Sequence, residues 1–231
     1  MTPVLELSRV IKDFHGLRPL RVKELIVCAG ERVALLGFDQ MMAEVFVNLV
    51  TGVILPDEGE VRLFGRATSA IEDSADWLAS VDRFGIVSER AVLMDRFTVV
   101  QNLAMPFSLD VEPPPGDIRR QAEQLAGEVG LPESTWAALA GELDAATRVR
   151  VRLGRALALN PSILLLEHAS AGTEAGAAIL GADIRSVAER RGTAIVALTA
   201  DATFARAVAT RVLTLEPASG RLKEHKPSRS W

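Results

Sequence analysis

Short apolar runs separated by polar turns dominate the first part of the chain. They cover residues 4–7, 25–28, 32–36, 60–63 and 84–87. The turn-forming residues Pro56-Asp57-Glu58-Gly59 precede the fourth run. Apolar runs of this length, bounded by turn residues, are typical of β-strands. We therefore expect a strand-rich first part.

The middle of the chain, residues 99–157, is rich in alanine and has a helical pattern. Pro113-Pro114-Pro115-Gly116 interrupts this pattern. Proline lacks the amide proton that a helix interior needs, so the interruption predicts a loop between helices. Residues 118–129 follow with apolar positions at helical spacing, which predicts a further helix there.

The last third alternates between two kinds of segment. Residues 163–166, 193–198 and 212–215 are continuous apolar runs, whereas residues 177–190 and 202–209 have helical patterns. Buried apolar strands that alternate with helices indicate a mainly parallel sheet covered on both faces, and hence the α/β class. The polar tail, residues 223–231, is expected to be loose.

Composition narrows the function classes. The chain has 231 residues, of which 48% are hydrophobic and 24% charged, which suits one globular domain or a core with an inserted subdomain. A net charge of -4 argues against general nucleic-acid binding. Cys28 is the single cysteine, which excludes a disulfide framework and favours a reducing, cytosolic setting. We expect neither a signal peptide nor a membrane span, so any work at a membrane requires a docking partner.

Residues 37–44 lie between a strand-like run and an apolar helical run, which is where a nucleotide-binding protein has its phosphate loop. That loop has the pattern G-x-x-x-x-G-K-[ST], because backbone amides, a lysine and a hydroxyl hold phosphate and magnesium. Gly37 matches the first glycine, but Met42, Ala43 and Glu44 replace the second glycine, the lysine and the hydroxyl.

The residues around this loop resemble the ATP-binding subunit of ABC transporters over nearly the whole chain. They are the spacing from Gly37 to Thr51-Gly52, the segment 56–61, the segment 150–157, and Pro161 followed by residues 163–166. The resemblance implies a P-loop-NTPase-like α/β fold with helices on both faces of a mainly parallel sheet. It also implies an N-terminal antiparallel β part and an inserted helical subdomain. We predict an ATPase-like core formed by residues 1–94 and 157–231, and a helical subdomain at 95–156.

Most of the family's functional residues are replaced at the positions that match its motifs. The signature falls on Leu143-Asp144-Ala145-Ala146-Thr147, and the Walker B acids fall on Glu167-His168. The Q-loop glutamine falls on Glu89, the D-loop on Ala171-Gly172-Thr173-Glu174, and the switch histidine on Ala200. An aromatic at the position that stacks on adenine is kept as Phe14, for which the alternative is a partly buried aromatic with no ligand.

These replacements have electrostatic consequences. Side chains at Gln40 and Met42 disfavour the positive φ that a phosphate loop uses, and Ala43 cannot neutralise phosphate charge. Each of Asp39 and Glu44 would repel a phosphate by about 3 kcal/mol at roughly 5 Å and an effective dielectric of about 20. Asp39 also suits a helix start, so we expect the carboxylates to take the electrostatic role of phosphate and the loop to fold without ligand.

We therefore predict no catalytic residue and no metal site, with ATP and magnesium binding weak or absent. His168 is a candidate base, against a histidine satisfied at a strand end. Glu167 is a candidate magnesium ligand, against a structural carboxylate bonded to nearby backbone. The arginines Arg148, Arg150, Arg152 and Arg155 are expected to form a salt-bridged surface.

The leading hypothesis is a non-hydrolysing ABC-type subunit with a structural or regulatory role. Its partners would be a membrane permease subunit and a second ATPase-like subunit, either the same chain or an intact homologue. It would lie in the cytoplasm, peripheral on the inner face of the membrane, and neither bind nucleic acid nor insert into the membrane. Residues 92–97 and 105–107 match the region that grips the permease in the family, although apolar residues there are ordinarily core.

Against an intact partner subunit, Asp144 would repel the partner's γ-phosphate, so the composite site would also be impaired. Two alternatives stay open: an ATP-hydrolysing subunit with unorthodox site residues, and a soluble oligomerisation protein without a membrane partner.

Overall fold

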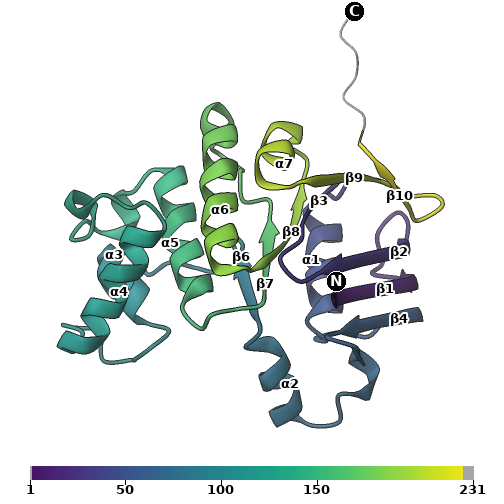
Figure 1. The fold of residues 1–231 in the computed structure, drawn as a ribbon, viewed down its shortest axis with the longest axis horizontal. Helices are drawn as coiled ribbons and strands as arrows, with labels where there is room; N and C mark the ends of the chain where they lie inside the picture. The colour runs from purple at the N-terminus through teal and green to yellow at the C-terminus, as the bar shows by residue number, and fades with distance from the viewer. Residues whose placement is uncertain (1, 226–231) are drawn as a thin grey trace, which may run out of the picture.

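Two β-sheets form the framework of the computed structural model, which describes residues 2–225 apart from the side chain of Glu174 (Figure 1). The first sheet is antiparallel, in the order β2 (Leu20–Cys28), β1 (Pro3–Lys12), β4 (Glu58–Leu63) and β5 (Arg66–Ala67). The second has the order β10 (Arg221–Glu224), β9 (Arg211–Glu216), β3 (Arg32–Leu36), β8 (Ala194–Thr199), β7 (Ile163–Glu167) and β6 (Phe84–Val87). All neighbours in the second sheet are parallel except β10 and β9. The predicted α/β class with an antiparallel N-terminal part is confirmed.

Helices cover both faces of the parallel sheet. They are α1 (Gln40–Val50), α2 (Ser74–Val81), α3 (Val99–Ala104), α4 (Gly116–Glu128), α5 (Ala145–Leu157), α6 (Ala177–Arg191) and α7 (Ala202–Val208). Short 3-10 turns lie at Thr68–Ala70, Glu133–Thr135, Ala140–Glu142 and Glu174–Gly176.

Alternate residues of β7 point to opposite faces of the sheet, as the strand period requires. Leu164 and Leu166 belong to the core cluster that α3 to α7 cover. Ile163 and Leu165 belong to the cluster that contains α1 and the antiparallel sheet. Helix α1 therefore lies between the two sheets, with its first residue close to the carboxyl ends of the parallel strands.

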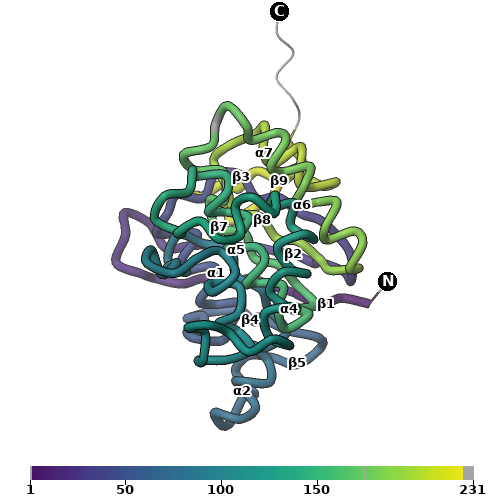
Figure 2. Tube along the Cα trace, turned by 90° about the vertical axis from the view of Figure 1, so that its left-hand side faces the viewer, coloured from purple at the N-terminus to yellow at the C-terminus, as the bar shows by residue number. Residues whose placement is uncertain are grey.

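Residues 95–156 contain α3, α4 and most of α5, which lie on one side of the molecule (Figures 1 and 2). The triple proline lies outside the helices, directly before α4, as predicted. Helix α5 packs tightly on α3 because it has Gly154 at the crossing, where an added Cβ would lie 2.6 Å from Cδ2 of Leu103. The division into core and helical subdomain stays a prediction.

Several features differ from the sequence expectations, and both β1 and β2 extend well beyond the predicted residues 4–7 and 25–28. Lys223 and Glu224 are not loose but belong to β10, where they pair with Thr214 and Leu213. Their polar side chains gave no strand signal, whereas backbone pairing at a sheet edge needs none. Residues 226–231 of the predicted loose tail lie outside the described residues. The helix α2 was not predicted either, because it buries no residue and so shows no clear apolar face.

Within residues 2–225, no helix is both long and apolar enough to cross a membrane.

Candidate functional site

The candidate site surrounds the start of α1, beyond the end of β3. Gly37 follows β3 with φ of +90°, a conformation that L-residues with side chains rarely adopt. An added Cβ at this position would also lie 3.3 Å from the carbonyl oxygen of Leu215. The backbone turn itself therefore explains this glycine, with no ligand needed.

Asp39 caps the start of α1. Its Oδ1 accepts a hydrogen bond of 2.8 Å from the amide of Met42. Gln40 and Met42 both have helical backbone, so α1 begins at Gln40 and leaves no wide loop before it. The prediction that a carboxylate caps this helix is confirmed for Asp39. Such a cap satisfies an amide that would otherwise be free to bind an anion.

Glu167, at the end of β7, is held by two side chains and has no exposed side-chain surface. Gln40 Nε2 donates to its Oε1 at 2.6 Å. Arg90 Nη2 donates to Oε2 at 2.5 Å, and Arg90 Nε donates to Oε1 at 3.2 Å. The expectation that Glu167 bonds to nearby backbone is therefore wrong. Both oxygens of this carboxylate are taken up by groups of the protein.

Arg90 also contacts Glu44, with 3.3 Å between Arg90 Nη1 and Glu44 Oε1. We call the contacts of Arg90 with Glu44 and Glu167 the Arg90 bridge. The hydrogen bond to Glu167 is the main cause that raises the pKa of Arg90, and the charges of Glu167 and Glu44 act in the same direction, whereas burial opposes them. Glu44 thus pairs with a cation and does not take the role of phosphate at the helix start, which corrects the sequence expectation.

Arg90 is the residue of this candidate site that the sequence did not single out. It directly follows Glu89, the residue at the Q-loop position, whose own side chain is exposed. The available signal was a single arginine beside Glu89, whereas the other charged residues at the motif positions are acidic.

His168 has a φ of 46°, in the left-handed region, and its amide donates to the carbonyl of Leu198 at 2.9 Å. Its Nε2 is buried and has no hydrogen-bond partner among the described residues. The expectation of a satisfied histidine is therefore wrong for this atom. His168 takes no part in the Arg90 bridge.

The helices at the signature and switch positions also begin with capping aspartates. Asp144 accepts 2.7 Å from the amide of Thr147, at the start of α5. This hydrogen bond from the Thr147 amide is the main cause that lowers the pKa of Asp144. Asp201, next to Ala200, accepts hydrogen bonds of 2.8 Å from the amide of Thr203 and 3.1 Å from the amide of Phe204. Like α1, both helices use their own carboxylates where an anion would bind.

The remaining motif residues lie apart from this cluster. Phe14 is partly buried and packs against the core that contains α1, and an added Cβ at Gly16 would lie 2.5 Å from its ring. Its stacking on adenine stays a prediction. At the D-loop position, Ala171 and Gly172 are exposed, whereas Thr173 is buried and donates 2.8 Å to the carbonyl of Ser170.

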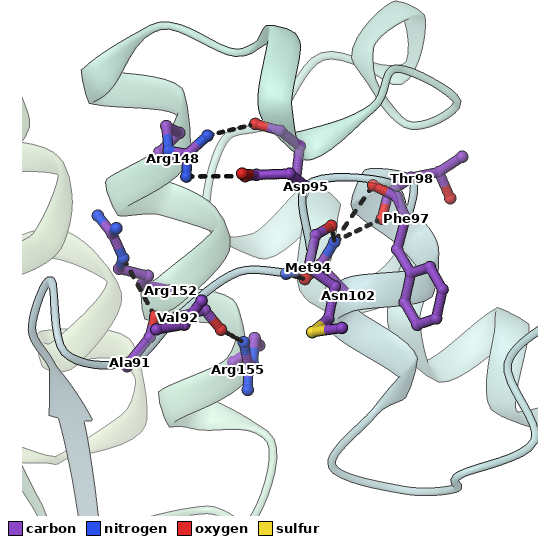
Figure 3. A network of polar contacts seen from close by, with 11 residues as sticks. Ala91, Val92, Met94, Asp95, Phe97, Thr98, Asn102, Arg148, Arg152 and Arg155 are labelled. Carbon is purple, nitrogen blue, oxygen red and sulfur yellow. Dashed lines mark hydrogen bonds and ion pairs between the residues drawn. The ribbon is translucent and has the colours of Figure 1, made fainter.

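The four arginines of α5 divide into two pairs, and Figure 3 shows three of them, Arg148, Arg152 and Arg155. Arg148 contacts Asp95 at 3.1 Å and Arg150 contacts Asp183 at 2.6 Å, so the expected salt bridges are confirmed for these two. For the other two the expectation is wrong, because they bind backbone carbonyls. Arg152 Nε donates a hydrogen bond of 3.3 Å to the carbonyl of Ala91, and Arg155 Nη1 donates one of 2.7 Å to the carbonyl of Val92.

Burial lowers the pKa of both Arg152 and Arg155. These two arginines thus fix the backbone that follows Arg90.

The predicted docking segments differ in exposure. Val92 and Met94 are 68% and 45% exposed, whereas Leu93 between them is buried. Met105 and Phe107 are partly buried and pack against the core. Residues 92–94 therefore offer the more accessible apolar surface.

The chain is similar to known proteins along most of its length. Residues 23–171 match the sequence profile of the family described as ABC transporter. The lipoprotein-releasing system ATP-binding protein LolD of Psychrobacter arcticus is 30% identical over 172 residues, which are 73% of this chain and 76% of LolD. The methionine import ATP-binding protein MetN of Brucella abortus is 28% identical over 97% of this chain, which spans 60% of MetN.

Solved structures show the same fold. The chain superposes on cbiO1 of Clostridium perfringens, part of the ABC transporter complex cbiONQ, with a TM-score of 0.79 at 17% identity, over 96% of this chain and 87% of cbiO1. It superposes on a dimeric ATP-binding cassette, MJ0796 with ADP and Pi, with a TM-score of 0.74 at 23% identity, over 96% and 98% of the two chains. The chain therefore belongs to the ABC transporter family and has the α/β fold of its ATP-binding domain.

Proposed function

We propose that this chain is a non-hydrolysing ABC-type subunit that assembles with a membrane transporter complex in a structural or regulatory role. The observation that carries the proposal is the state of Glu167. This buried acid at the Walker B position is bonded to Gln40 and Arg90, which take up both of its carboxylate oxygens. An arginine that bridges two carboxylates supplies the positive charge that a bound cation supplies in a working site.

The start of α1 supports weak nucleotide binding. The lysine position is Ala43, which is fully buried in the helix, and Asp39 caps the helix that would receive the phosphates. A nucleotide would have to displace this carboxylate and break the Arg90 bridge without gaining a lysine contact. Binding of ATP and magnesium is therefore proposed to be weak or absent.

The lack of a suitable base supports the absence of hydrolysis. His168 replaces the acid that would polarise the attacking water, and its Nε2 is buried within the protein. The switch position is Ala200, which has no polar side-chain atom. Phosphoryl transfer depends on positioning and charge stabilisation, which these residues do not provide.

Assembly is proposed with a membrane permease subunit and a second ATPase-like subunit, on the cytoplasmic side of the membrane. The relatives LolD and MetN are named as parts of a releasing system and an import system, and MJ0796 forms a dimer. The exposed side chains of Val92 and Met94 are proposed to contact the permease. Exposed apolar residues that gather in a patch can mark a protein interface.

The second candidate function is ATP hydrolysis with unorthodox residues. The names of the relatives favour it, because LolD and MetN are both ATP-binding proteins. This candidate requires Glu167 to leave Arg90 and bind magnesium.

Purification of the native complex through a tag on this chain tests the proposal. We expect a polytopic membrane protein and a second ATPase-like subunit to co-purify, and the Glu167→Gln variant to leave the ATPase rate per complex unchanged. Glutamine keeps one acceptor oxygen for Gln40 and for Arg90 Nε, whereas its NH2 group cannot accept from Arg90 Nη2, and it cannot hold magnesium as a carboxylate does. A loss of ATPase activity in a normally assembled Glu167→Gln complex would show that this chain hydrolyses ATP. Purification without any membrane protein would instead favour a soluble oligomerisation protein.

A further inference from the structure

Residues 88–98 form an irregular segment between β6 and α3, yet hydrogen bonds fix it along its length. Near its start, Ser88 Oγ accepts from the amide of Arg90 at 3.1 Å, and the amide of Ala91 donates to the Ser88 carbonyl at 3.1 Å. In the middle, Arg152 and Arg155 of α5 bind the carbonyls of Ala91 and Val92. A segment with so many bonds is more rigid than an ordinary surface loop.

The far end of the segment is held by Asn102, which is fully buried in α3 (Figure 3). Its Oδ1 accepts a hydrogen bond of 2.9 Å from the amide of Met94, and its Nδ2 donates one of 3.1 Å to the carbonyl of the same residue. Nδ2 also lies 3.3 and 3.1 Å from the carbonyls of Phe97 and Thr98. These bonds join the segment to the helical region.

Arg90 makes the complementary connection. Among the side-chain hydrogen bonds and ion pairs of residues 2–225, those of Arg90 with Glu44 and Glu167 connect this segment to α1 and β7. The hydrogen bonds of Asn102, Arg152 and Arg155 connect the segment to α3 and α5 instead. Arg90 thus supplies the side-chain contacts that join the segment to α1 and β7.

We propose that the Arg90 bridge is a built-in conformational restraint that holds residues 88–98 in one arrangement, with Val92 and Met94 exposed, in the absence of any ligand. Two carboxylates on different elements, Glu44 on α1 and Glu167 on β7, attract one guanidinium and so define its position. The planar guanidinium binds Glu167 through two of its nitrogens, which a lysine cannot reproduce. This inference goes beyond the proposed function, because it concerns the ordering of a surface and not the loss of hydrolysis.

The consequence concerns the exposed pair Val92 and Met94. Since backbone bonds hold their segment before any partner arrives, a partner that contacts them does not have to order the loop. Ordering of loops and side chains is one of the main costs of association. The segment is therefore preorganised for the permease contact proposed above, and this consequence rests on that proposed function.

Hydrogen exchange of the full chain without ligand, measured by mass spectrometry, tests the restraint. We expect Arg90→Ala to speed exchange in peptides covering residues 88–98 by roughly tenfold or more, because local opening no longer breaks an ion pair. Labelling times are kept short enough that peptides from β8 and α6 do not exchange in the natural chain, and at those times both should stay protected in the variant as well. The control Arg62→Ala removes an arginine that pairs with the exposed Glu60, and it should change none of these rates.

Arg90→Lys provides a second variant that keeps the charge. We expect faster exchange of residues 88–98 than in the natural chain, but slower than in Arg90→Ala, because lysine cannot bind Glu167 through two nitrogens. If Arg90→Ala does not fold, hydrogen exchange of the same peptides in Arg90→Lys tests the proposal. Unchanged exchange at residues 88–98, or a rise shared equally by β8 and α6, would overturn the proposal.

Discussion

Removal of the Arg90 side chain is expected to destabilise the fold far more than removal of an exposed arginine. Arg90→Ala leaves Glu167 buried, with the hydrogen bond from Gln40 as its remaining side-chain contact. A buried carboxylate without a counter-ion is costly, because the protein interior solvates charge poorly. The effect should therefore appear in the free energy of unfolding of the isolated chain.

The magnitude follows from the geometry of the pair. Truncating one partner of a buried ion pair costs about 3–5 kcal/mol. The side chain of Arg90 is 39% exposed, so water screens part of its charge, and Gln40 still binds Glu167. We therefore expect a loss of about 2–3 kcal/mol. For a chain of this size, that lowers the melting temperature by about 4–12 °C.

Urea denaturation followed by tryptophan fluorescence measures the loss, and a double-mutant cycle assigns it. Arg90→Ala, Glu167→Gln and the double variant should give a coupling energy of about 1–2 kcal/mol. The matched control is Arg62→Ala, whose arginine binds Glu60 at 2.6 Å with both side chains exposed. A loss for Arg90→Ala no larger than that for Arg62→Ala, or no coupling to Glu167, would refute the reasoning.

Three further changes test other parts of the structure. Asn102→Ala should cost about 1–3 kcal/mol in urea denaturation, because the amide of Met94 loses its hydrogen-bond acceptor, whereas the carbonyls of Met94, Phe97 and Thr98 keep backbone donors; no loss would contradict the role given to Asn102. Gly154→Ala should cost about 1–3 kcal/mol because the new Cβ meets Leu103, whereas Gly127→Ala on α4, where the Cβ meets nothing within 4 Å, should stabilise by about 0.5–1 kcal/mol. Equal effects of these two substitutions would contradict the packing described. Since the pKa of Asp144 is lowered in the folded state, its ionised carboxylate stabilises the fold above its ordinary pKa of about 3.9 and loses this effect as the pH falls through the lowered value. The stability difference between the natural chain and Asp144→Asn should therefore stay constant from neutral pH down to about pH 5 and shrink as the pH falls below about 4, and a difference that stays constant below about pH 4 would contradict the cap.

The sequence predicted most of the fold because its core elements carry strong patterns. The strands β3 and β6 have the predicted bounds, and β7 extends the predicted run by Glu167. These strands are buried, so nearly every residue is apolar. The helix α2 and the strand β10 escaped prediction because they bury little, and an exposed element leaves no clear periodic pattern.

The site was predicted only in part. Asp39 was identified as a helix cap, since capping depends on residues close together in sequence. The Arg90 bridge was not found, because Arg90 is 46 residues from Glu44 and 77 from Glu167. Only the parallel pairing of β6 with β7 brings the residues after these strands to one edge of the sheet. The unsatisfied Nε2 of His168 was likewise invisible, because it depends on how neighbouring chain segments pack.

The most direct test of the central claim, that this chain does not use ATP, is isothermal titration calorimetry of the full chain with Mg-ATP. The matched positive control is an intact ATP-binding relative titrated in the same buffer. The account predicts no saturable heat for this chain, corresponding to a Kd of about 1 mM or weaker. Saturable binding with a Kd of about 10 μM or tighter would contradict it.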